Sequence, residues 1–326
     1  MSLLELKDLT IHFFTDEGVV KAVNSLSLHV GEGETLGLVG ETGAGKTTTA
    51  LGIMTPDPPG KIVSGQIIYN GEDLVRKSQI EMRDIRGRQI SMIFQDPMTA
   101  LNPVLTVGDQ IAEVIRLHEE ISRADAYLKA AEMLEMVGIA NSQGVYEMYP
   151  HELSGGMRQR VMIAMALACN PKVIIADEPT TALDVTIQAQ ILDLLRSLKD
   201  RINSSIMLIT HDLGVIAEMA DYVVVMYAGR VVEKGTAQEI FANPAHPYTI
   251  GLMASKPIVG KKVDRLYSIP GKVPNPVNMP NYCYFKDRCE MALPCCDGEY
   301  PCEISLSPTH KVSCYRYYEE NRKAGE

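Results

Sequence analysis

The sequence lacks the features that mark membrane-spanning, nucleic-acid-binding and secreted proteins. No apolar run approaches the roughly 20 residues that a membrane-spanning helix needs. The 31 Lys and Arg residues are outnumbered by 41 Asp and Glu, for a net charge of −10. Nucleic acid is therefore not expected as the main partner, because binding to its backbone needs clustered basic residues. Residues 1–7 alternate like a strand and show no signal-peptide pattern, so we expect a cytosolic protein whose membrane role comes through a partner.

The length and the cysteines indicate one large domain with a smaller part attached. A chain of 326 residues exceeds a typical single domain, and its 46% hydrophobic content supports a real core. Of the seven cysteines, Cys169 stands alone and the others lie between residues 283 and 314. In a reducing compartment such a cluster favours metal binding over disulfides.

One glycine-rich stretch fits the phosphate-loop pattern of Gly, four residues, then Gly-Lys-Ser/Thr. Its residues are Gly40, Glu41, Thr42, Gly43, Ala44, Gly45, Lys46 and Thr47. The apolar segment 35–39 predicts a buried strand before it, and 47–54 predicts a helix after it. Glycines let backbone N–H groups converge on an anion, and the helix N-terminus adds partial positive charge. These flanks favour a nucleotide site over a bare turn, with Lys46 reaching the β- and γ-phosphates and Thr47 binding Mg²⁺.

Strands are predicted on both sides of this loop, at 3–30 before it and, ending in a turn, at 61–71 after it. Residues 3–30 alternate between apolar and polar with a break at 15–18, which predicts antiparallel strands around a turn. Phe13 and Phe14 lie in this region, where an aromatic face could stack on a purine; packing in the core is an equal alternative for either ring.

A second group of motifs begins with a short apolar strand at 90–93, which leads to Gln95. The neutral amide of Gln95 could touch Mg²⁺ or a water. Helical periodicity from about 105 to 170 then predicts a helical insertion between strands. Within it, Ser154 can cap a helix over 157–168.

The start of that capped helix has a second possible role. Ser154, Gly155 and Gly156 could form a phosphate-binding helix N-terminus rather than only a cap. Because the chain already has its own phosphate loop, this second element makes most sense when it is offered to a nucleotide on another chain.

The apolar segment 173–177 predicts a buried strand that ends in two carboxylates, Asp177 and Glu178. Adjacent acids there are costly unless they serve a metal or a reaction. Asp177 suits coordination of Mg²⁺, through water, and Glu178 suits polarising an attacking water. The next predicted strand, 205–210, ends at His211, whose place at the same sheet edge favours contact with the γ-phosphate over a structural role.

Together these motifs resemble the ATP-binding subunit of an ABC transporter. By this resemblance Walker A is 40–47 with Thr48 beside it, the Q-loop is Gln95, the signature is 153–159, Walker B is 174–178, the D-loop is 182–184 and the switch histidine is His211. Phe13 is the best match to the family's adenine-stacking aromatic. The resemblance implies an ATPase that binds ATP and Mg²⁺.

The resemblance also implies the architecture. We expect an α/β fold: a P-loop NTPase core with an antiparallel β subdomain and an inserted helical subdomain at about 96–170. This nucleotide-binding domain would cover residues 1–255. A linker and a small Cys-rich C-terminal domain would cover 256–326.

Three longer stretches are similar to the dipeptide/oligopeptide (peptide/nickel) importer branch of that family, namely 94–103, 149–160 and 243–249. The resemblance implies uptake of di- or oligopeptides, with nickel or another small solute as the alternative. It implies a second, usually different, ATPase subunit, so that each ATP lies between Walker A of one subunit and the signature of the other. It further implies two transmembrane permease subunits, an extracytoplasmic solute-binding protein and a location on the inner face of the membrane.

Three rival interpretations explain fewer of the residues. A soluble ABC ATPase acting on nucleic acid or ribosomes would usually have a long coiled coil, or two cassettes joined by a basic linker. An exporter's ATPase half is normally fused to membrane spans. A redox- or metal-sensing protein with secondary ATPase activity would rely on the cysteine tail.

Prolines after about residue 255 mark a linker, and the cysteines follow in a segment too short for a strong core. Cys283, Cys289, Cys296 and Cys314 have five, six and seventeen residues between successive members. Four thiolates suit structural zinc or an iron–sulphur cluster, and the spacing alone does not decide. By resemblance, the spacing matches the tail of the peptide-importer branch, some of whose members hold a 4Fe–4S cluster. We therefore expect a cluster with a structural role; the alternative is Zn²⁺, with the substitute ligands Cys295, Cys302 or His310.

Overall fold

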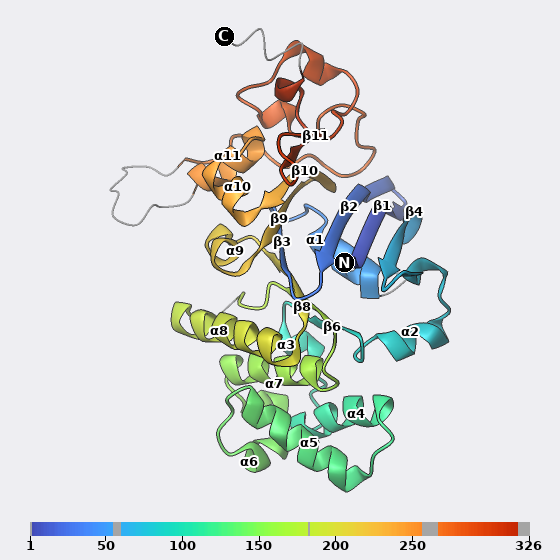
Figure 1. Cartoon of the computed structure of the whole chain (residues 1–326), viewed down its shortest axis with the longest axis vertical. Helices are drawn as coiled ribbons and strands as arrows, with labels where there is room; N and C mark the ends of the chain where they lie inside the picture. Colours follow the sequence, from blue (N-terminus) through green and yellow to red (C-terminus); the bar gives the residue numbers. More distant parts are fainter. Residues whose placement is uncertain (1, 55–59, 182, 256–266, 319–326) are drawn as a thin grey trace. The chain divides into compact units, whose positions relative to one another are not determined.

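The computed structural model describes residues 2–54, 60–181, 183–255 and 267–318. The chain divides into two compact units, and both combine strands with helices (Figure 1), as expected of an α/β protein. The first unit comprises Met1–Leu4, Val30–Thr35 and Asp73–Ile209. The second unit comprises Glu5–His29, Leu36–Glu72 and Thr210–Glu326.

The first unit is built on parallel strands in the order β8-β7-β6. Their bounds are β6 (Ile90–Ile93), β7 (Val173–Asp177) and β8 (Ser205–Thr210). Every residue of these strands is buried. Parallel strands covered on both faces have continuous apolar runs rather than alternation, and the strands predicted from those runs are confirmed.

Most helices of the first unit lie between β6 and β7, where helical periodicity predicted an insertion (Figure 1). They are α3 (Pro97–Ala100), α4 (Val107–His118), α5 (Arg123–Met136), α6 (Ser142–Tyr146), the 3-10 turn η2 (Pro150–Glu152) and α7 (Gly155–Leu167). Helix α5 packs against α4, α6 and α7. The unit also contains η1 (Leu74–Arg76), α2 (Gln79–Ile85) and α8 (Val185–Ile202).

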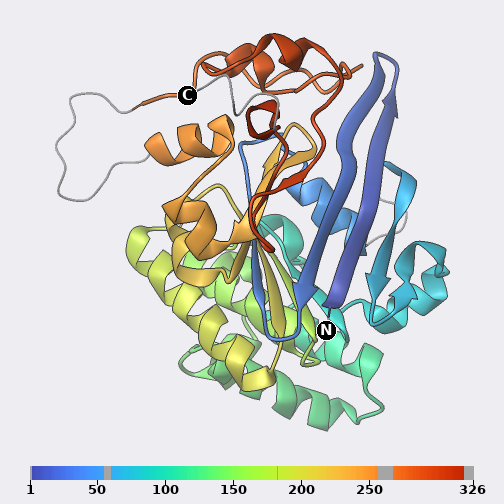
Figure 2. The same cartoon turned by 45° about the horizontal axis from the view of Figure 1, so that its top comes forward.

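The second unit contains a long hairpin of β1 (Ser2–Thr15) and β2 (Gly18–Gly31), which confirms the predicted antiparallel strands (Figure 2). Strands β4 (Lys61–Tyr69) and β5 (Glu72–Asp73) extend this sheet in the order β2-β1-β4-β5.

A further group of strands in the second unit has the order β11-β12-β10-β9-β3. Their bounds are β3 (Thr35–Val39), β9 (Tyr222–Tyr227), β10 (Arg230–Thr236), β11 (Ile304–Ser305) and β12 (Lys311–Val312). β3 and β9 pair in parallel, and the pairs from β9 to β11 are antiparallel. The helices of this unit are α1 (Lys46–Met54), α9 (Leu213–Met219), α10 (Ala237–Ala242), α11 (Pro247–Ala254), η3 (Lys286–Arg288), η4 (Pro294–Asp297) and η5 (Tyr315–Tyr317).

The C-terminal segment, residues 267–318, is joined to the rest of the second unit by backbone pairing. Val312 of β12 lies opposite Glu233 of β10. Lys21 N–H of β2 donates to the carbonyl of Pro276 at 3.0 Å. Val312 also packs in a small apolar cluster with Ala245. The segment is therefore built into the sheet instead of relying on a core of its own.

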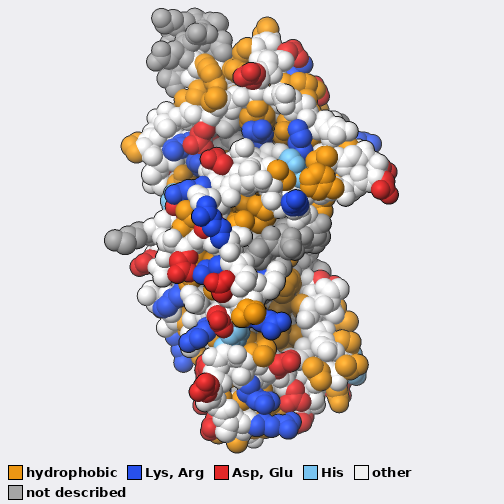
Figure 3. Space-filling model, turned by 90° about the vertical axis from the view of Figure 1, so that its right-hand side faces the viewer, with side chains coloured by type: hydrophobic (Ala, Val, Ile, Leu, Met, Phe, Trp, Pro, Cys, Tyr) orange, Lys and Arg blue, Asp and Glu red, His pale blue; other side chains and the backbone are white. Residues whose placement is uncertain are grey.

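Two features concern the membrane and nucleic acid as partners: the apolar character of the helices and the distribution of charge on the surface. Among the described residues, no helix combines the length and the apolar character that crossing a bilayer requires. On the face shown in Figure 3, the Lys and Arg side chains are interspersed with Asp and Glu.

Candidate functional site

The phosphate loop runs from β3 to α1 in the second unit, as predicted. Gly45 has a φ of +92°, and a Cβ there would lie 2.4 Å from the carbonyl oxygen of Ala22. A Cβ on Gly40 would lie 2.2 Å from the carbonyl oxygen of Met226. Only glycine allows this close approach of one backbone to another, so the loop shape depends directly on these two positions.

Within the loop, Lys46 is buried and its ammonium is hydrogen-bonded to backbone carbonyls of the loop. Its Nζ donates to the carbonyl of Gly40 at 2.8 Å and to that of Glu41 at 3.2 Å. Thr47, at the start of α1, is exposed, and Thr48 is half-buried. The residues of the predicted phosphate loop therefore form one turn between β3 and α1, with Thr47 exposed.

In the first unit, the structure brings Gln95 and Glu178 together. The side-chain amide of Gln95 donates to Glu178 Oε2 at 3.2 Å, and the hydroxyl of Thr181 donates to the same oxygen at 2.8 Å. Glu178 has a φ of +46°, a conformation uncommon for a non-glycine residue. Asp177, the last residue of β7, is 1% exposed. Two hydrogen bonds thus orient the Glu178 carboxylate. One of the two donors, Thr181, was not predicted from the sequence.

Ser154 caps helix α7, as predicted. Its hydroxyl accepts the N–H of Met157 at 3.3 Å, and the helix begins at Gly155, two residues earlier than expected. A Cβ on Gly155 would meet nothing within 4 Å, whereas one on Gly156 would lie 3.2 Å from Ile187 Cγ2. The N-terminus of α7 is therefore open at Ser154 and Gly155, which are exposed.

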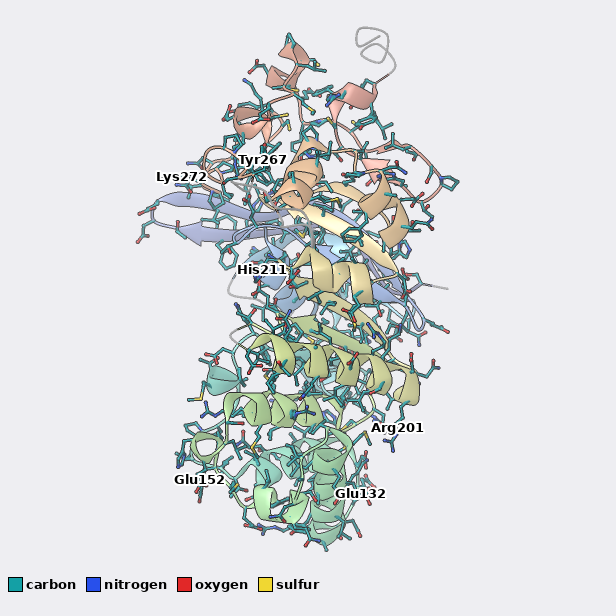
Figure 4. All side chains as sticks on the ribbon, turned by 90° about the vertical axis from the view of Figure 1, so that its left-hand side faces the viewer. Glu132, Glu152, Arg201, His211, Tyr267 and Lys272 are labelled. Atoms are coloured by element: carbon teal, nitrogen blue, oxygen red, sulfur yellow. The ribbon has the colours of Figure 1, made fainter. Side chains whose placement is uncertain are left out.

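Of the remaining predicted site residues, His211 and Phe13 lie in the second unit and the D-loop lies in the first. His211 is exposed and directly follows β8 (Figure 4). Phe13 of β1 is half-buried beside Gly60, and its neighbour Phe14 is 64% exposed. The D-loop predicted at 182–184 includes residue 182, which lies outside the described residues; Asp184 caps α8.

The four cysteines predicted as ligands converge on one cavity of about 10 Å³, which His246 also lines. They are Cys283, Cys289, Cys296 and Cys314. Burial raises the pKa of all four thiols, to about 12 for Cys283 and about 11 for Cys314, so without a cation they are neutral. As the side chains stand, no three His, Cys, Asp or Glu residues of the described chain form a group that could hold a metal ion.

The substitute ligands considered for zinc lie elsewhere. Cys295 and Cys302 are exposed and do not line the cavity. His310 is buried with its Nε2 2.8 Å from Oε1 of Glu233. The four cysteines chosen from the spacing therefore share the cavity with His246, which the sequence did not single out.

One contact at the phosphate loop has no local signature in the sequence. The guanidinium of Arg288 donates to both carboxylate oxygens of Glu41, at 2.7 and 3.1 Å, across 247 positions of sequence. The hydroxyl of Tyr248 accepts the Glu41 N–H at 2.8 Å. Both partners were missed because such pairs follow from tertiary structure rather than from spacing.

Comparisons with known proteins agree with the motifs. A family model described as "ABC transporter" matches residues 23–181, and one described as "Oligopeptide/dipeptide transporter, C-terminal region" matches residues 232–296. The oligopeptide transport ATP-binding protein AppD of Bacillus subtilis is 48% identical over 98% of this chain and 98% of its own length. OppD of Escherichia coli, with the same description, is 46% identical over 98% of this chain and 94% of its own.

Solved structures show the same fold. The chain is similar to the ATP-binding cassette MJ0796, solved as a dimer in a post-hydrolysis state bound to ADP and Pi. The TM-score is 0.65 and the identity 28%, over 72% of this chain and 98% of that one. The likeness covers an ATP-binding cassette and leaves about a quarter of this chain outside it.

Proposed function

The chain belongs to the family of oligopeptide transport ATP-binding proteins, which are ABC ATPases, and on this premise we propose that it hydrolyses ATP to energise uptake of di- and oligopeptides through a membrane importer. The observation that carries the proposal is identity of 46% to 51% with such proteins over almost the whole chain. The separate match to the C-terminal region of oligopeptide/dipeptide transporters supports peptides over nickel as the solute.

We assign the steps of hydrolysis to the residues predicted from the motifs. Lys46 and the loop N–H groups bind the β- and γ-phosphates, with His211 at the γ-phosphate and Phe13 against adenine. Glu178, aimed by its hydrogen bonds, polarises the attacking water.

The proposed Mg²⁺ ligands are Thr47, Gln95 and Asp177. Their donors are all oxygen atoms, the type that Mg²⁺ prefers. The buried Asp177 carboxylate supplies the negative charge that such an ion requires. Bound Mg²⁺ neutralises charge on the phosphates.

We propose that two ATPase subunits form the working site and that they are different chains. Ser154, Gly155 and Gly156 of one subunit approach the nucleotide held by the phosphate loop of the other. The open N-terminus of α7 supports this role, because backbone N–H groups there can receive an anion. The dimeric structure of MJ0796 gives further support. Two permease subunits and an extracytoplasmic binding protein complete the importer, with this chain on the inner membrane face.

We propose that residues 1–255 form the nucleotide-binding domain and 256–326 a linker and Cys-rich domain with a 4Fe–4S cluster. The donor set fits, since four thiols surround one cavity. As the side chains stand, the described residues form no group that could hold a metal ion, so either a single ion or a cluster requires the thiols to move. Metal binding would add folding free energy to this short segment.

Metal analysis tests this assignment. Protein purified without oxygen should be brown and contain iron and acid-labile sulphide, and Cys289→Ser should remove the colour while ATP binding persists. Stoichiometric zinc without sulphide would replace the cluster by a zinc site with the same ligands. Protein with neither metal would remove the metal proposal altogether.

Uptake measurements test the function itself. A strain that lacks the gene for this chain should lose uptake of labelled dipeptide and pentapeptide. Wild-type protein should restore uptake, and Lys46→Ala should not. Loss of ⁶³Ni²⁺ uptake with unchanged peptide uptake would refute the peptide assignment, and no loss of either would refute a role in this importer class.

A further inference from the structure

The C-terminal segment reaches the phosphate loop through one buried arginine. Arg288 is 7% exposed, and its two terminal nitrogens donate hydrogen bonds to the two oxygens of the Glu41 carboxylate. Its Nε donates to the carbonyl of Pro270 at 2.8 Å, and one terminal nitrogen also donates to the hydroxyl of Tyr227 at 3.3 Å. Paired hydrogen bonds between a guanidinium and a carboxylate are among the strongest and most directional in proteins.

A second contact holds the backbone of the same loop residue. The Tyr248 hydroxyl accepts the Glu41 N–H, and Tyr248 is completely buried. The rings of Tyr227, Tyr248 and Phe285 pack together, with centroids 4.7 to 5.3 Å apart. Side chain and backbone of Glu41 are therefore both fixed by residues far along the chain.

The position of Glu41 matters because it is part of the anion site. Its carbonyl is one of the two acceptors of the Lys46 ammonium. Its carboxylate brings a negative charge into a loop whose ligand is also negative, and like charges at short range repel. A loop with Glu at this position needs that charge to be neutralised and directed away from the phosphates.

We propose that Arg288 is a positioning residue for nucleotide binding: by holding and neutralising Glu41, it keeps the phosphate loop receptive to ATP. The proposal rests on the proposed ATPase function. It makes the C-terminal segment part of the nucleotide site without contact with the nucleotide itself.

The local structure ties this arginine to the cysteines. Arg288 is the last residue of η3. The turn is closed by Lys286 N–H donating to the Cys283 carbonyl and Cys289 N–H donating to the Lys286 carbonyl, both at 3.0 Å. Two of the cavity cysteines thus flank the turn that places the guanidinium.

Substitutions that remove the charges of the ion pair, made in the full chain, test the proposal. The probe is ATP without Mg²⁺, titrated calorimetrically so that hydrolysis does not interfere. Arg288→Gln should weaken ATP binding about tenfold, since one unneutralised carboxylate then lies near the anion; tenfold corresponds to about 1.4 kcal/mol. The double variant Glu41→Gln/Arg288→Gln should recover most of the affinity although the ion pair is gone, and Arg288→Lys should keep part of it.

Controls separate this effect from general damage. Lys272→Gln removes a positive charge from an exposed position of the same segment and should leave affinity unchanged (Figure 4). The double variant leaves no unpaired charge at this contact, so its comparison with Arg288→Lys keeps the test decisive even if Arg288→Gln folds poorly.

Two results would overturn the proposal. Unchanged ATP affinity in Arg288→Gln would show that the contact does not position the loop. Equal losses in Arg288→Gln and the double variant would show a structural effect without the charge mechanism. Absence of ATP binding by wild type and by Lys272→Gln would instead refute the proposed ATPase function.

Discussion

Replacing Glu178 by Gln tests the chemistry at the site with little change in shape. In the structure, Gln95 and Thr181 both donate to one oxygen, Oε2, of the carboxylate. The amide oxygen of a glutamine can occupy that position and accept both hydrogen bonds. The variant should therefore fold normally and keep the orientation of the side chain. It should lose only the capacity to take a proton from water.

The expected size of the effect follows from the loss of a general base. Such groups contribute roughly 10²- to 10⁴-fold, so the activation barrier should rise by about 3 to 5 kcal/mol. Two charge-assisted hydrogen bonds become neutral ones at a half-buried position, which costs at most about 1 kcal/mol of stability. The temperature of unfolding should therefore fall by no more than about 3 °C.

The assay combines phosphate release with size-exclusion chromatography in ATP and Mg²⁺. Glu178→Gln should bind ATP, release almost no phosphate and accumulate as an ATP-bound dimer together with its partner subunit. Thr181→Val is the matched control: it removes one hydrogen bond to the carboxylate but leaves the base, so its loss should be much smaller. Hydrolysis by Glu178→Gln at the wild-type rate would show that another group activates the water.

Three other perturbations give distinct signatures. Lys46→Ala should weaken ATP binding itself by about tenfold or more, because a charged donor to the phosphates is lost, as titration of the monomer would show. Gly156→Asp should leave monomer affinity unchanged but reduce hydrolysis at least about tenfold through repulsion of the partner's nucleotide; an equal loss of monomer affinity would contradict a shared site. Hydrogen bonds to the Glu239 carboxylate, of which the one from the Ser307 side chain has the largest effect, lower the pKa of Glu239 to about 2. The contribution of these bonds to stability is therefore complete above about pH 4.5 and is lost as the pH falls towards 2. Glu239→Gln should flatten that part of the curve of unfolding temperature against pH, and parallel curves would contradict the assignment.

The buried strands and the phosphate loop could be predicted because their signals are local. β7 and β8 are apolar throughout, since both faces are covered, and the loop must have glycine where backbones touch. Helix α2 was missed although Ser78 and Glu81 form a capping box, a signal present in the sequence.

The contacts of the C-terminal segment could not be predicted from the sequence. β11 and β12 are two residues long each, too short for alternation to show. The pair of Glu41 and Arg288 joins positions separated by most of the chain, and nothing near either residue indicates the other. Thr181 was missed for a related reason, since its role depends on the turn after β7 rather than on a motif.

The buried carboxylate of Glu233 has a consequence for how the chain can be shortened. Glu233 is fully buried and accepts hydrogen bonds from the N–H groups of Ala245 and His246, while His310 from the C-terminal segment lies against the same carboxylate. A chain cut after residue 255 would keep the ATP-binding motifs but lose that histidine. Loss of β12 would also expose the edge of β10, and its unpaired backbone groups could then pair with strands of other chains. We therefore expect a chain cut after residue 255 to aggregate for reasons unrelated to its catalytic residues.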